Sequence, residues 1–433
     1  MPGCSAGPTD RRVSLSMRFL MIVLMSLLLG SITLPAQEST GTAADSTEFY
    51  RHKYRSKKTW EHVVSAPGTL VSLPLVLFFK LNEALVGYIY DSKIIPKTKD
   101  FFTSHDEMRG IYPVYSNRSG GGLKFYQEGI FNPESKLSLT ASGNLRERQR
   151  YRFEWKRIRL LDPLLFRMRL RYRYLPDEAF YGVGPDSRKE DLASFDHEYT
   201  MAEAGFDLDL TRKLSLFSVF RYDYNNAYNG DEHRPIRDLY DKTTLPGLQS
   251  RVKIAQVQAG LALDSRNRLG NPNAGNELIL SGSLFRDTDG DRFNFWKIEG
   301  DLTHYLHFGY NRVLAIRVAG ALTEAEDGAS VPFYFLSELG ERESIRGFDR
   351  GRFRDLDMFL GSLEYRIPIW HSIDSFFFAD AGQVANDIFK DLSGKDLQFG
   401  FGGGIRFYNT KDLVAVLQVA ASKERFRIYF NLN

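Results

Sequence analysis

The stretch Phe166-Arg167-Met168-Arg169-Leu170-Arg171-Tyr172-Arg173-Tyr174 alternates strictly between apolar or aromatic residues and arginine. In an extended strand successive side chains point to opposite faces, so one face of this segment would be apolar and the other would carry four arginines. Residues 200–210 and 314–322 alternate in a similar way, and no convincing helical pattern follows Gly110. The C-terminal part of the chain is therefore predicted to be all β.

Alternation alone does not separate a membrane barrel from a soluble sheet, because both have the same period. The spacing of the connections is more informative. Among sixteen strand windows, those with even numbers are followed by short turns, whereas long connections at 176–196, 227–250, 324–355 and 385–395 follow odd-numbered strands. This sorting is typical of outer-membrane barrels. We predict that residues 109–433 form a closed antiparallel 16-stranded transmembrane β-barrel, after a short helical N-terminal periplasmic segment.

The arginines agree with a barrel that has a wet interior. Each would cost about 2–4 kcal/mol against lipid near the bilayer midplane, whereas inside a barrel it can meet water and carboxylates. Glu203, Asp207 and Asp209 lie on a neighbouring predicted strand and can supply such carboxylates. The alternative is that these arginines lie on the solvated face of a soluble sheet. The predicted basic wall of the lumen comprises Arg150, Arg152, Arg167, Arg169, Arg171 and Arg173.

The composition excludes several other classes. The 433 residues include 57 Lys+Arg against 54 Asp+Glu, 14% aromatic residues and one cysteine. This is neither a disordered chain nor a disulfide scaffold. Only one N-terminal stretch approaches the apolar length of a membrane-spanning helix, and the near-neutral charge gives no reason to expect nucleic acid as a partner.

The N-terminus has the pattern of an export signal. A basic flank precedes an apolar core at 19–29, and residues 34–36 end in Ala36, near which cleavage is predicted. Residues 37–108 are predicted to be a periplasmic lead, with short amphipathic helices within 59–90 that are broken by prolines. We expect these helices to lie along the inner membrane surface or to pack on the next domain; a membrane span is the alternative.

Three motifs resemble those of a known family. Ser344-Ile345-Arg346-Gly347-Phe348, in the longest connection, closely resembles the IRGF/VRGF loop signature of the BamA/TamA-type outer-membrane assembly superfamily, also called the bacterial surface antigen family. Residues 263–275 are similar to its D-x-R-[DN]…P-x-x-G hairpin, and Phe378-Ala379-Asp380-Ala381-Gly382 to its F-x-D-x-G strand. Residues 180–184 are similar to a loop common in that family. The resemblance covers about 109–433.

The resemblance implies a mechanical site. In that family the sixth outer loop folds back into the lumen, and its RGF arginine meets acidic side chains on the next two strands. Carried over, the latch would consist of Arg346, Gly347 and Phe348 with Glu364 and Asp380. Alternation independently places Glu364 on the inward face. The alternative is that Arg346 lies in a solvated outer loop.

The resemblance also implies a role in inserting or translocating proteins, or lipids, through a weak seam between the first and last strands. Pro113 in the first strand cannot donate to a ladder and belongs on an edge, so we place the seam at Pro113 and Phe430. Two features depart from the family. The chain ends in Asn433 rather than an aromatic residue, and 37–108 lacks the pattern of a POTRA module. The chain therefore resembles a short branch without POTRA modules.

The sequence contains few patterns that are typical of catalytic or metal sites. There is no phosphate loop, His304 and His307 point to opposite faces of a strand, and 287–291 fits a hairpin turn better than a calcium loop. We expect no enzyme activity, no cofactor and no metal.

Expected partners are outer-membrane lipid, unfolded outer-membrane proteins and a separate periplasmic module, with the bacterial outer membrane as the location. Alternatives are a passive channel gated by the inward-folded loop 327–352 and a lipolytic enzyme.

Overall fold

The computed structural model describes residues 102–116, 120–241, 243–309, 311–370, 372–408 and 413–432. The chain divides after Glu107 into two compact units, and the second, Met108–Asn433, contains all the strands described below. The predicted signal peptide 1–36 and the predicted helices within 59–90 lie outside the described residues. Within the described ranges, no helix has both the length and the apolar character needed to cross a membrane.

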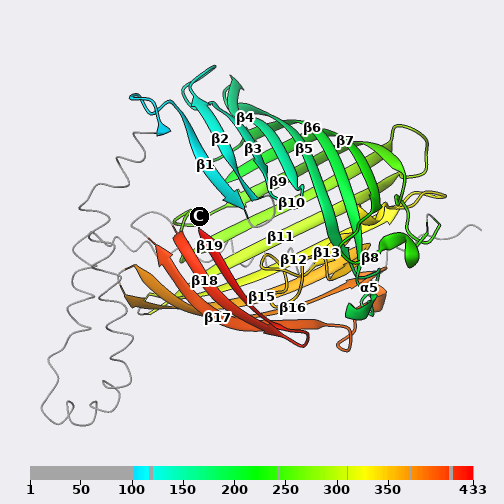
Figure 1. Ribbon diagram of the computed structural model, residues 1–433. Helices are drawn as coiled ribbons and strands as arrows, with labels where there is room; N and C mark the ends of the chain where they lie inside the picture. The colour runs from blue at the N-terminus through cyan, green and yellow to red at the C-terminus, as the bar shows by residue number, and fades with distance from the viewer. Residues whose placement is uncertain are drawn as a thin grey trace, which may run out of the picture. The chain divides into compact units, whose positions relative to one another are not determined.

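The main sheet has 17 strands, of which sixteen follow one another in an up-and-down order (Figure 1). The seventeenth, the two-residue β8 (Arg234–Pro235), pairs in parallel with the start of β6. The sixteen strands are β1 (Arg109–Ser116), β2 (Gly120–Glu128), β3 (Lys136–Gly143), β4 (Gln149–Leu161), β5 (Leu164–Phe180), β6 (Ala193–Asp209), β7 (Leu214–Asn229), β9 (Arg251–Asp264), β10 (Gly275–Asp287), β11 (Phe295–Phe308), β12 (Arg312–Ala325), β15 (Asp357–Trp370), β16 (Ile373–Ala385), β17 (Gln398–Tyr408), β18 (Leu413–Ser422) and β19 (Phe426–Leu432).

The remaining elements lie in the connections. A separate two-stranded sheet of β13 (Ser337–Leu339) and β14 (Phe353–Asp355) lies between β12 and β15. The short helices are η1 (Lys189–Asp191), η2 (Ile236–Asp238), η3 (Phe333–Phe335) and α5 (Ile388–Asp391). The side chain of Asp387 caps α5 by accepting hydrogen bonds from the N–H groups of Phe389 and Lys390.

The sheet separates apolar from polar residues as the alternation predicts. At the middle of β9, Val257 is paired with Phe220 of β7 and Leu284 of β10, and all three side chains are about half exposed on the outer face. Gln256 and Gln258 flank Val257 on the opposite face, where their amides donate to Ser283 and Ser281 at 3.2 Å. An apolar outer face around a polar interior is the arrangement of a membrane barrel.

The longest connections follow odd-numbered strands of the sixteen. β6 and β7 are joined by a tight turn in which the Thr211 hydroxyl accepts hydrogen bonds from the N–H groups of Lys213 and Leu214. In contrast, 326–356 separates β12 from β15. Two connections depart from the predicted sorting, since 129–135 after the second strand and 265–274 after the eighth are longer than tight turns. The second of them reaches β15, where the Pro272 carbonyl accepts a hydrogen bond from Arg366 at 3.0 Å.

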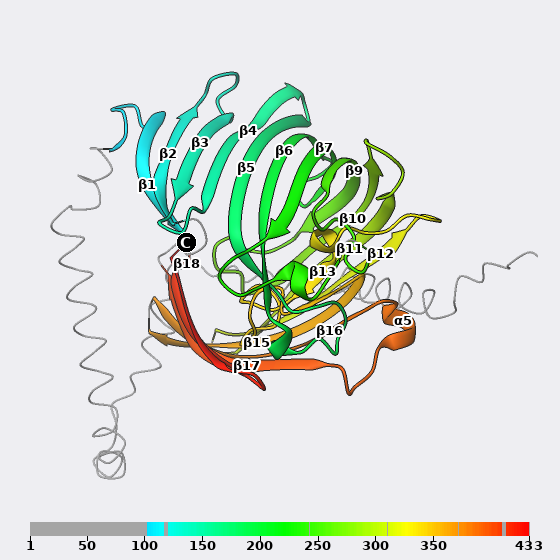
Figure 2. The ribbon, with the colours of Figure 1, turned by 45° about the vertical axis from the view of Figure 1, so that its right-hand side comes forward.

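Closure of the barrel stays a prediction. Each of the sixteen strands pairs with its neighbour in sequence, but among the described residues no ladder joins β19 to β1. These two strands border the interruption in the row of strands in both views (Figures 1 and 2). Among the described residues β1 and β19 are therefore the edge strands, at the place where the sequence predicts a weak seam.

The two faces of β9 allow a direct test of the membrane assignment. We expect Val257→Arg to lower the free energy of unfolding by about 2–4 kcal/mol, because its charge would face lipid near the middle of the strand. The neighbouring Gln258→Arg faces the polar interior and is expected to cost less than about 1 kcal/mol. Urea unfolding in lipid vesicles measures both. Equal losses for the two variants would contradict the assignment of the outer face.

Candidate functional site: the inward loop and the lumen wall

Arg346 is held by carboxylates from two adjacent strands. Its Nε and Nη2 donate to the two oxygens of Asp380 on β16, at 2.7 and 2.6 Å, and its backbone N–H donates to Asp380 Oδ2 at 3.0 Å. Nη1 donates to Oε2 of Glu364 on β15 at 3.3 Å. The bidentate geometry makes the Asp380 pair the stronger of the two contacts.

These contacts are buried, so losing either partner would affect the stability of the fold strongly. The side chain of Asp380 is completely buried, and that of Arg346 is 9% exposed. The guanidinium carbon lies 3.4 Å from the centre of the Phe378 ring, and Ser362 bridges the pair, accepting from Arg346 and donating to Asp380. Removing one charge here would leave the other buried without its partner, which is more costly than losing an exposed pair.

The backbone of the loop tip packs directly on the later strands. Gly400 on β17 leaves room for the Arg346 carbonyl, since an added Cβ would lie 2.0 Å from that oxygen. Gly347 has φ +97, a conformation that favours glycine. Its N–H donates to the Tyr429 hydroxyl on β19 at 3.1 Å, and its carbonyl accepts from the Ser422 hydroxyl at 3.0 Å.

The residue after the glycine anchors the loop by apolar contact. Phe348 is fully buried and packs in a cluster on the inner side of the sheet. The cluster comprises Ala319, Leu339, Ile345, Phe348, Phe353, Leu360 and Val384. Burial of an aromatic side chain of this kind contributes about 1.5–3 kcal/mol. Arg346, Gly347, Phe348, Glu364 and Asp380 are thus brought together in one site.

A second set of ion pairs ties the loop to the last hairpin and to another loop. Arg352, with a side chain 3% exposed, pairs with Glu424 at 2.8 Å and donates to the Ser187 carbonyl at 2.8 Å. Asp349 pairs with Arg425 and Arg427. Sequence reasoning missed these contacts, although the alternation of β19 places Arg427 and Tyr429 on its inward face.

The predicted basic wall contains arginines that pair closely with carboxylates and arginines that face one another across a ladder. Arg167 pairs with Asp207, and Arg169 lies between Glu154 at 2.9 Å and Glu203 at 3.1 Å. The register of β4 and β5 sets Arg150 opposite Arg173 and Arg152 opposite Arg171. Within the described residues, the buried Nε atoms of Arg150, Arg152 and Arg171 have no hydrogen-bond partner. Sequence reasoning also missed Glu154 as a partner.

The two predicted seam residues lie on the two edge strands. Pro113 of β1 is opposite Leu123 of β2, and Phe430 of β19 is opposite Leu417 of β18. Both side chains are exposed on the outer face. No ladder brings them together among the described residues.

The contacts of the site are ion pairs, hydrogen bonds and apolar packing. The described residues hold no group of three or more His, Cys, Asp or Glu side chains placed to bind a metal ion. What the arrangement can do is fix a long loop to the inner wall at several points. An up-and-down sheet with an apolar outer face, a charged interior and such a loop defines an outer-membrane-type β-barrel protein.

The comparisons with known proteins agree with this class. Residues 114–410 match the Omp85 superfamily domain, and the chain belongs to that superfamily. Omp85 barrels are bacterial outer-membrane proteins. No curated protein sequence matches the chain.

Two solved structures show the range of structural similarity. BamA from Haemophilus ducreyi lacking POTRA domains 1–3 aligns with TM-score 0.57 and 17% identity, over 74% of this chain and 69% of that one. CdiB from Acinetobacter baumannii aligns with TM-score 0.46 and 16% identity, over 74% of this chain and 56% of that one. The similarity to BamA supports the fold.

The Arg346–Asp380 pair yields a stability prediction. Arg346→Ala leaves Asp380 buried without its cation, so we expect a loss of about 3–5 kcal/mol in the free energy of unfolding. The matched control is Arg350→Ala on the same loop, where the side chain is 44% exposed and the pair with Glu338 spans 3.4 Å; it should cost less than about 1 kcal/mol. Denaturant unfolding measures both. A loss below 1 kcal/mol for Arg346→Ala would show that the loop is not held by this pair.

Proposed function

We propose that this protein assists the insertion or translocation of proteins, or of lipids, at the outer membrane. The route in this proposal is the interface between β1 and β19. The observation that carries the proposal is that the described residues of these strands form no ladder with each other, whereas every other neighbouring pair of the sixteen is hydrogen-bonded. An unpaired strand edge is a template on which another extended chain can add.

The composition of β1 supports this route. Pro113 has no N–H to donate, so β1 cannot form a complete ladder along its free side. β1 and β19 are also short, with eight and seven residues, whereas β5 and β6 each have 17. Fewer backbone hydrogen bonds can form at the β1–β19 interface than between the long strands, so less free energy is needed to open it.

In this proposal the inward loop acts as a latch that stiffens the wall beside the interface. Arg346 joins β15 and β16, while Gly347 contacts β19. The loop would keep the last strands in register when β19 is not paired with β1. A separate periplasmic module would then supply the client-binding role that POTRA modules have in BamA-type proteins.

A reversible cross-link tests the route. We expect a cleavable bis-maleimide between Pro113→Cys and Phe430→Cys, in a Cys4→Ser background, to lower the rate of client-barrel insertion into vesicles at least about tenfold, because it prevents β1 and β19 from separating. Reduction of the linker should restore the rate. Gel-shift assay of client folding measures it.

The matched control bridges a pair that is already in a ladder. Val257→Cys and Leu284→Cys face each other on β9 and β10, and their cross-link should leave insertion unchanged. Equal activity of the open and cross-linked Pro113/Phe430 forms would eliminate the lateral route. If the uncross-linked protein moves neither protein nor lipid, the assembly role itself fails.

A passive channel is the second candidate, and the basic interior favours it. A cavity of about 420 Å³ is lined by Arg167, Arg169 and Arg221 among others. In this reading the loop 327–352 limits passage, and anions would cross more readily than cations. Planar-bilayer recording is expected to show a small anion-selective conductance that increases when 327–352 is deleted. Conductance at background level in both proteins would remove this candidate.

A further inference from the structure

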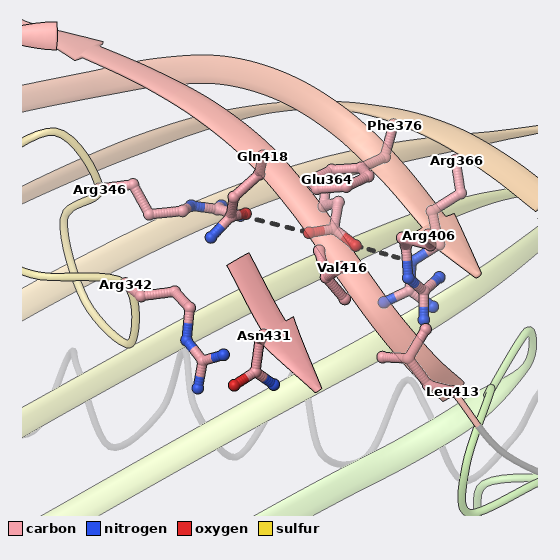
Figure 3. Close-up of a pocket in the computed structure, with 10 residues that line it drawn as sticks. All are labelled: Arg342, Arg346, Glu364, Arg366, Phe376, Arg406, Leu413, Val416, Gln418 and Asn431. Atoms are coloured by element: carbon pink, nitrogen blue, oxygen red, sulfur yellow. Dashed lines mark hydrogen bonds and ion pairs between the residues drawn. The ribbon is translucent and has the colours of Figure 1, made fainter. Parts of the chain in front are cut away.

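A cavity of about 300 Å³ lies between the inward loop and the strands β15 to β19 (Figure 3). Four arginines line it, Arg342 and Arg346 from the loop, Arg366 from β15 and Arg406 from β17. Glu364 is the carboxylate that lines it. The cavity is therefore a basic compartment of limited size, on the inner face of the sheet.

Glu364 is already engaged by two of these arginines. Its Oε1 accepts from Arg366 Nε at 2.7 Å, and its Oε2 accepts from Arg346 Nη1 at 3.3 Å. Arg346 is further neutralised by Asp380, and Arg366 donates to the Pro272 carbonyl. These contacts engage both oxygens of Glu364, and among the described residues Arg406 makes no hydrogen bond to it.

The guanidinium of Arg406 is buried, but its capacity for hydrogen bonds and ion pairs is only partly used. Its side chain is 5% exposed, and its ion pair with Asp374 is long, at 3.9 Å. Asp374 instead accepts a hydrogen bond from Tyr408 with its other oxygen, at 3.1 Å. Within the described part of the chain, Arg406 Nη1 is buried without a hydrogen-bond partner. A buried guanidinium in this state is costly unless an anion completes it.

We propose that this cavity binds an oxyanion of the phosphate type, with Arg406 as its principal donor. A guanidinium presents N–H groups in a planar fork that fits phosphate oxygens. Gln418, 4% exposed on β18, also lines the cavity and offers a neutral amide donor. A tetrahedral phosphate can accept from donors on several sides at once, whereas the two oxygens of a carboxylate lie in one plane.

The anion can be free phosphate or the phosphate of an anionic lipid headgroup. Asn431 on β19 lines the cavity, and β19 is the strand with no ladder to β1. The site therefore lies next to the open edge of the sheet, where a lipid on the outer face could present its headgroup. This binding site goes beyond the proposed assembly role and does not depend on it.

Isothermal titration of the purified full chain in detergent tests the site with three probes: inorganic phosphate, dihexanoyl phosphatidylglycerol and acetate. We expect saturable binding of a phosphate-bearing probe, and at least about tenfold weaker binding to Arg406→Gln, because a charged donor is lost. Arg286→Gln is the matched control. Arg286 lies on β10, outside the cavity lining, is 48% exposed and pairs with Glu326, and its variant should bind as the unmodified protein does.

The three probes distinguish free phosphate from a lipid headgroup and show which results would contradict the proposal. Binding of inorganic phosphate assigns the free anion, and binding of the lipid alone assigns a headgroup. The proposal is overturned if neither binds, if acetate binds as tightly, or if Arg406→Gln binds unchanged. Should Arg406→Gln not fold, Gln418→Leu decides: it keeps every charge, removes one donor and should weaken binding several-fold. Unchanged affinity in that variant overturns the proposal as well.

The melting temperature gives a second readout. A ligand that binds only the folded state raises the melting temperature by mass action, so the phosphate-bearing probe should stabilise the unmodified protein and not Arg406→Gln. Without the probe, Arg406→Gln should be no less stable than the unmodified protein, because it removes a poorly paired buried charge. A marked loss of stability would instead mean that Arg406 is already satisfied by the protein.

Discussion

The structure depends first on the pairing of backbone N–H and C=O groups. In hydrocarbon no water can satisfy these groups, so a spanning sheet must pair nearly all of them within itself. Fifteen consecutive ladders meet this requirement from β1 to β19. The exception among the described residues is the place between the first and last strands, where no ladder is formed, and the proposed activity is located there.

The charged interior follows from the same environment. An arginine on the outer face would meet lipid, so the alternation of the strands directs these side chains inward, where carboxylates and water are available. Glu203, 4% exposed, accepts from both Arg169 and Arg221 and so joins β5, β6 and β7 on their inner side. At the Arg152–Arg171 pair two arginines face each other across the ladder, and Arg152 pairs with Glu154 at 3.6 Å.

Much of the fold could be predicted from the sequence because strand period and turn spacing are local signals. The sixteen strands and the inward orientation of Glu364 follow from such signals. The extent of β5 and β6 was underestimated, since 176–180 and 193–196 lack the alternation of the strand centres yet continue the ladder. Pro113 predicts a weak seam at the first strand, but the lack of a described ladder between β1 and β19 could not be predicted, because pairing between residues more than 300 positions apart leaves no local pattern.

The site was predicted in part for the same reason. The motif identified Arg346 and its acids, but it carried no information on contacts specific to this chain. The pairing of Arg352 with Glu424, and the poorly satisfied Arg406, depend on how the loop and the last strands pack in three dimensions. Residues that act through such long-range packing are found only when the coordinates are known.

The several attachments of the loop tip have a mechanical consequence. Gly347, Asp349 and Arg352 each contact the last two strands or the turn between them, and Arg352 also reaches Ser187 in the connection between β5 and β6. A displacement of the terminal hairpin would pull on the loop and, through it, on a segment on the far side of the sheet. The loop thus links the terminal hairpin to the connection between β5 and β6 by contacts that do not pass through the strands between them.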